Sequence, residues 1–92
     1  MKTYTIDGSR IGSQADFFTE IGRAVNGDGG YFGSNLDALA DCLRGGFGTP
    51  DSGGFRFVLA PYRPARAAIG EPVWSRLLRV FADTGVDLWL AG

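Results

Sequence analysis

The chain has 92 residues, enough for one domain around one hydrophobic core, and its net charge of −1 argues against a general nucleic-acid binder. It contains no histidine, which excludes Ser-His-Asp and Cys-His catalysis, paired-histidine nuclease chemistry and the usual zinc sites. We therefore expect a single domain over residues 1–92 that uses no metal and no cofactor.

The N-terminal segment alternates polar and apolar residues, and no stretch approaches the length of a membrane span. It lacks the unbroken apolar run of a signal peptide, so we expect a cytoplasmic protein with no membrane partner. Cys42 is the only cysteine and can form no internal disulfide, in agreement with a reducing compartment. We expect its side chain to be a small apolar core residue.

The first predicted strand covers residues 3–6 and ends at a turn. A helix follows, with Ser13 as its N-cap and Asp16 completing a capping box. Its apolar stripe at helical spacing consists of Phe17, Phe18, Ile21 and Val25. The glycine-rich segment 26–30 ends this helix.

A second helix is predicted after Ser34, taken as its N-cap. Its buried face consists of Leu36, Leu39 and Leu43. Gly45 and Gly46 end the helix. Residues 47–54 are rich in Gly, Pro and Asp and predict a loop, and the apolar run 55–60 predicts a central strand.

Two further helical segments and a last strand complete the chain. Residues 63–69 predict an irregular or short helical crossing, and Pro72 suits the first turn of a helix that stops near Gly85. The inward side of that helix carries Val73, Trp74, Leu77, Leu78 and Phe81. Residues 86–90 form the last predicted strand. Two helices between each pair of strands favour parallel pairing, so we predict an α/β fold in which helices pack on a three-stranded parallel sheet.

Acidic and basic residues are unevenly distributed. Residues 24–43 contain three aspartates and no Lys or Arg, whereas residues 44–79 contain six arginines and two acids. Asp37 and Asp41 lie one turn apart, about 40° around the helix axis, and opposite the leucines. Such a like-charge pair destabilises an isolated helix by about 0.2–0.5 kcal/mol, so fold stability does not explain it. A local acidic patch favours a cationic partner surface.

Simpler roles exist for both acids. Asp37 is three residues after Ser34, where it could complete a capping box and meet the positive end of the helix dipole. Asp41 could be an ordinary solvated acid, weakly paired with Arg44. Paired-carboxylate catalysis is disfavoured because neighbours on a convex helix cannot straddle a substrate, and a magnesium site lacks a third ligand.

The segment before the second helix contains glycines and two aromatic residues. The glycines are spaced neither as a Walker loop nor as a dinucleotide fingerprint, which favours a flexible loop. Of Tyr31 and Phe32, we expect one to pack on the core and the other to lie at the surface. An exposed aromatic residue beside two acids is typical of a protein-binding patch.

Residues 31–43 (YFGSNLDALADCL), followed by Gly45, closely resemble the signature of the barstar family, intracellular inhibitors of a secreted bacterial ribonuclease. Residues 4–8 and 85–90 are similar to the first and last strands of that family. The resemblance implies a three-stranded parallel sheet covered by helices, in agreement with the order of elements.

The resemblance also implies a function. It predicts a non-enzymatic protein that binds a secreted guanyl-specific ribonuclease one to one, with the second helix and the loop before it plugging the active site. Asp41 would be the main anchor, Asp37 would lie beside it, and Tyr31 would pack on the catalytic histidine of the enzyme. The partner-binding residues that the resemblance implies are Tyr31, Gly33, Asn35, Asp37, Ala38, Asp41, Arg44, Gly45 and Gly46.

The chain departs from the family pattern at three positions. Ala40 and Gly46 stand where the pattern usually has tryptophan, and Val80 stands near the place of an acid in the last helix, with Asp83 as the nearest substitute. Two other functions remain open: a barstar-like interaction module that uses the same helix on a non-ribonuclease partner, and a small enzyme with an acidic patch.

Overall fold

The computed structural model describes residues 1–50 and 53–92. Within them, a three-stranded parallel sheet and four α-helices confirm the predicted α/β fold. The elements in chain order are β1 (Lys2–Asp7), the short 3-10 helix η1 (Gly8–Arg10), α1 (Gln14–Asn26), α2 (Leu36–Arg44), β2 (Phe55–Ala60), α3 (Tyr62–Ile69), α4 (Val73–Thr84) and β3 (Asp87–Leu90). No helix in the described part of the chain is long and apolar enough to cross a membrane.

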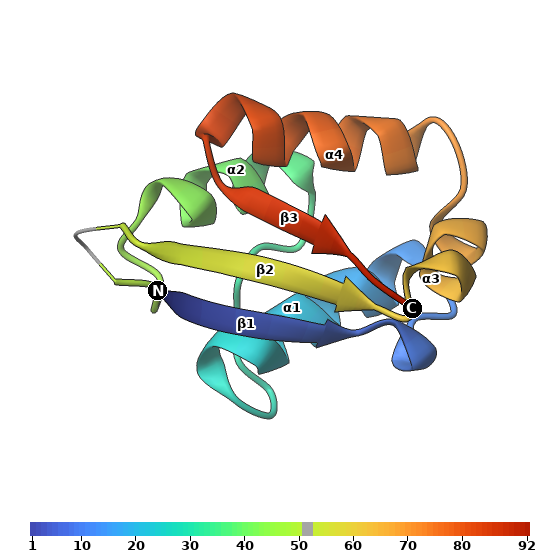
Figure 1. The fold of residues 1–92 in the computed structure, drawn as a ribbon, viewed down its shortest axis with the longest axis horizontal. Helices are drawn as coiled ribbons and strands as arrows, with labels where there is room; N and C mark the ends of the chain where they lie inside the picture. The colour runs from blue at the N-terminus through green and yellow to red at the C-terminus, as the bar shows by residue number, and fades with distance from the viewer. Residues whose placement is uncertain (51–52) are drawn as a thin grey trace.

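The strands lie side by side in sequence order, with β2 in the centre and both pairs parallel. Tyr4 is opposite Phe57, and Ile6 is opposite Leu59. Successive residues of a strand point to opposite faces, so these four side chains share one face, and all four are buried. In Figure 1, α1 and α2 lie behind the sheet.

The opposite face of the sheet is partly exposed and carries both polar and apolar residues. Thr3 and Thr5 of β1 and Trp89 of β3 lie on it. The Arg56 guanidinium stacks 4.3 Å above the centre of the Trp89 ring, and its Nε donates a hydrogen bond to Thr3 Oγ1 at 3.0 Å. One arginine thereby links all three strands on this side.

Phe57 of the central strand lies at the middle of the core. Its ring centre is 5.9 Å from that of Phe32, in the loop before α2, and 5.6 Å from that of Phe81 on α4. The helices complete this core with Phe17, Ile21, Leu39, Cys42, Leu43, Trp74 and Leu77. The burial of Cys42 confirms its predicted core position.

The beginning of α2 differs from the prediction. Its N-cap is Asn35, whose Oδ1 accepts a hydrogen bond from the Ala38 backbone N–H at 2.8 Å. Ser34 therefore does not cap the helix, and Asp37 is the second helical residue rather than the partner in a capping box. The prediction was wrong because Ser and Asn are about equally good caps, and only the path of the chain after Gly33 decides between them.

The other predicted boundaries agree more closely. Ser13 caps α1 through the Asp16 backbone N–H at 3.1 Å, although the Asp16 carboxylate accepts from Gly12 N–H and not from Ser13. The crossing predicted at 63–69 is a regular helix, α3. Of the loop predicted at 47–54, residues 51 and 52 lie outside the described residues.

Candidate partner-binding surface

Helix α2 has one buried side and one acidic side. Leu39, Cys42 and Leu43 are almost completely buried, and α2 packs against α4. Asp37 and Asp41 are exposed. Because the buried side and the Asn35 cap fix the helix, the two carboxylates project from a fixed support.

The two acids have different surroundings. Arg44 Nη1 lies 3.1 Å from Asp41 Oδ1, and both side chains are exposed. An exposed pair of this kind contributes about 0–1 kcal/mol, so a partner's cation can displace Arg44 at low cost. Within the described residues, Asp37 forms no ion pair or side-chain hydrogen bond. The surface therefore presents one weakly paired carboxylate beside one that is open to a partner.

The cysteine beneath these acids is not suited to be a nucleophile. Burial, and to a lesser extent the negative charge of Asp41, raises the pKa of the Cys42 thiol above its usual value. A raised pKa leaves less thiolate at neutral pH, and the thiolate is the reactive form. Cys42 therefore contributes packing to this surface.

Tyr31 extends the surface ahead of α2. Its side chain is 52% exposed, whereas Phe32 is fully buried, which confirms that the two aromatic residues divide between surface and core. The Tyr31 ring centre lies 6.2 Å from that of Phe47, a residue just after α2 that is 44% exposed. Phe47 was not predicted as a site residue. Its only signal in the sequence is an aromatic residue within a glycine-rich loop.

A comparison with protein families gives a match over residues 1–90 to the family described as Barstar (barnase inhibitor). The chain belongs to the barstar family. A comparison with curated proteins finds no match. Barstar is a family of barnase-type inhibitors and not of enzymes, and this membership accords with acids carried on a convex helix.

The structure divides the residues implied by the barstar resemblance into exposed and supporting groups. Tyr31, Asn35, Asp37, Asp41, Arg44 and Gly46 are exposed, whereas Ala38 and Gly45 are half-buried. Gly33 is buried with a φ of +96°, and a Cβ there would approach the Leu39 backbone nitrogen to 2.8 Å. A side chain at position 33 would therefore push the loop away from α2.

The departures from the barstar pattern also have defined positions. Ala40 is half-buried on α2, and Gly46 is exposed directly before Phe47. Asp83, near the end of α4, is exposed and lies 3.6 Å from Arg79. A surface ion pair on its own helix thus partly neutralises Asp83.

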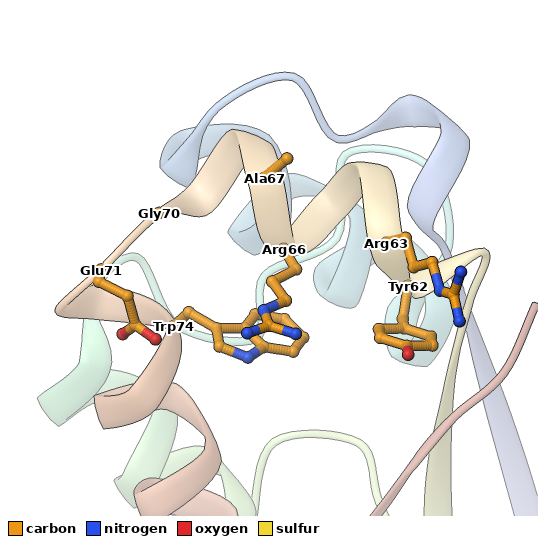
Figure 2. Close-up of a pocket in the computed structure, with 7 residues that line it drawn as sticks. All are labelled: Tyr62, Arg63, Arg66, Ala67, Gly70, Glu71 and Trp74. Atoms are coloured by element: carbon orange, nitrogen blue, oxygen red, sulfur yellow. The ribbon is translucent and has the colours of Figure 1, made fainter.

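A cavity of about 460 Å³ lies along α3, away from the residues of the barstar signature. Figure 2 shows Arg63 and Arg66 extending from α3, with Trp74 and Glu71 on the following segment. Glu71 is already engaged, because its two carboxylate oxygens accept hydrogen bonds from Ser75 N–H at 3.0 Å and Ser75 Oγ–H at 2.9 Å. Within the described residues, no group of three His, Cys, Asp or Glu residues is placed to hold a metal ion.

Proposed function

We propose that this protein inhibits a secreted microbial guanyl-specific ribonuclease by placing Asp37 and Asp41 in its active site, in a one-to-one complex. Membership of the barstar family supports inhibition of a barnase-type ribonuclease. The observation that carries the proposal is the pair of exposed carboxylates on a helix whose other side is buried.

The chemistry of the target favours such a pair. A ribonuclease active site gathers cations around the place of the substrate phosphate, and carboxylate oxygens accept the same charge-assisted hydrogen bonds. A convex helix can enter a concave cleft, and a fixed helix loses little conformational freedom on binding. Opposite potentials also speed association, an effect for which barstar complexes are themselves a standard example.

An inhibitor of a secreted enzyme protects the producing cell only if it meets the enzyme before export. We therefore place its action in the cytoplasm. The protein itself performs no catalysis in this proposal, and the acids act as ligands for the enzyme's cations.

The test is inhibition of a panel of microbial guanyl-preferring ribonucleases by micromolar protein. We expect Asp41→Ala to weaken binding to the ribonuclease by about 2–5 kcal/mol, roughly 30-fold or more. This is the general range for removing one partner of a charge pair in an interface, and barstar complexes are among the examples behind it. Asp87→Ala, which removes an exposed acid from β3, is the matched control and should inhibit normally. Full inhibition by folded Asp41→Ala would overturn the proposal.

A second candidate is an interaction module whose partner is not a ribonuclease. The observation that favours it is the absence of the family's two usual tryptophans, at Ala40 and Gly46. In that case no ribonuclease of the panel is inhibited. The wild-type chain captures another protein from a cell lysate, and Asp41→Ala abolishes this capture.

A further inference from the structure

Asn26, the last residue of α1, joins the two loops that flank α2. Its Nδ2 donates one hydrogen bond to the Tyr31 carbonyl and one to the Phe47 carbonyl, both at 2.8 Å. A side-chain amide nitrogen has two donor hydrogens, so both are used. One side chain thus ties together backbone segments that are 16 residues apart, one before α2 and one after it.

The segment around Phe47 is held against Asn26 by packing as well. Gly48 has a φ of +119°, and a Cβ there would collide with the Asn26 carboxamide. The next residue, Thr49, is buried. Phe47 therefore extends from an anchored backbone, although its ring is exposed.

These ties bring two exposed rings together. The Tyr31–Phe47 separation of 6.2 Å lies within the range of attractive aromatic pairs, and the interplanar angle is 56°. Both rings are close to half exposed, which leaves apolar area for a partner to cover. Aromatic side chains in such positions often dominate the energy of protein interfaces.

We propose that Tyr31 and Phe47 form one aromatic patch that binds the same ribonuclease whose cations receive Asp37 and Asp41, and that Asn26 positions this patch. The inference rests on the proposed function and extends it to Asn26 and Phe47, which lie outside the barstar signature. The two rings belong to the loops directly before and directly after α2, the helix that carries both acids. Phe47 is a contact residue here, and Asn26 is a positioning residue that acts through Tyr31 and Phe47.

The test measures the dissociation constant with the ribonuclease that the wild-type chain inhibits. We expect Phe47→Ala to weaken binding at least about fivefold, the usual threshold for an energetically important interface side chain. Phe47→Leu, which keeps an apolar side chain, should lose less. Trp89→Ala is the matched control, because Trp89 is 53% exposed on the uncovered face of the sheet, and it should bind normally.

A double-mutant cycle tests the role of Asn26. Asn26→Ala removes both donors and should weaken binding in the wild-type background, and should weaken it less once Phe47 is already alanine, because only the effect through Tyr31 then remains. A purely structural role would lower binding equally in both backgrounds and would overturn the positioning role. Urea denaturation of each variant separates lost binding from lost folding.

The outcomes distinguish this inference from the proposed function. If Asp41→Ala weakens binding while Phe47→Ala and Asn26→Ala bind as wild type, the aromatic patch is wrong and the proposed function stands. If Asp41→Ala has no effect, the proposed function itself is wrong.

Discussion

At the scale of single residues, the structure explains how α2 tolerates two neighbouring acids. Asp37 is the second residue of the helix, where the positive end of the dipole stabilises a carboxylate by about 0.3–1 kcal/mol. Asp41 has Arg44 one turn later. These two effects offset the mutual repulsion, so the helix can present both charges without a large loss of stability.

Cys42 provides a prediction at this scale. Because burial and Asp41 raise the pKa of its thiol, the native protein should react slowly with a thiol-specific disulfide reagent at about pH 8. The same protein in denaturing urea should react rapidly, since the thiol then regains its usual pKa and access to solvent. Equal rates in the two conditions would contradict the burial of Cys42.

At the scale of elements, the N-terminus of α2 controls the direction of both acids. Asn35 supplies the cap, and its carbonyl accepts the first helical hydrogen bond, from Leu39 N–H at 2.9 Å. The sequence alone could not decide between Ser34 and Asn35, since each has a side-chain oxygen suited to capping. The choice depends on the path of the chain between Gly33 and α2, where Gly33 lies directly against the backbone of Ala38 and Leu39.

Substitution of these two neighbours gives a matched test. Asn35→Ala should lower the free energy of unfolding by about 1 kcal/mol, because it leaves the Ala38 N–H without its cap. Ser34→Ala should change it by less than about 0.5 kcal/mol, as expected for an exposed residue outside the helix. Urea denaturation measures both values, and a larger loss for Ser34→Ala would show that the serine is the cap.

The sequence could predict the strands and helices, but it could not predict the contacts between distant segments of the chain. The alternation in β1, the apolar run of β2 and the leucine spacing of α2 are local patterns, and they predicted the strands, the helix and the exposure of Asp37 and Asp41. The Asn26 bridge and the Tyr31–Phe47 contact are not local, since they depend on the chain returning past the end of α1 after α2. No periodicity along the sequence records such a return, so Phe47 was missed.

At the scale of the whole molecule, charge is separated between surfaces while the total stays near zero. Figure 1 shows α2, which carries the acids, on the opposite side of the view from α3, whose arginines line the cavity in Figure 2. A net charge of −1 produces little long-range attraction by itself. Any steering of a cationic partner must therefore come from the local field of α2.

Salt should thus slow association with the inhibited ribonuclease. The Debye length falls from about 30 Å at 0.01 M salt to about 10 Å at 0.1 M, which screens attraction before contact. In stopped-flow experiments, the association rate of the wild-type chain should fall steeply between 0.01 M and 0.1 M salt. The association rate of the double variant Asp37→Asn/Asp41→Asn should fall less. Asp87→Asn should keep the wild-type dependence. An identical slope for all three would exclude steering by α2.

The most direct measurement is a crystal structure of the complex with the most strongly inhibited ribonuclease. We expect α2 to lie in the active-site cleft and the Asp37 and Asp41 carboxylates to accept hydrogen bonds from the enzyme's cationic side chains. A complex in which another surface fills the cleft, with both carboxylates left in solvent, would contradict it.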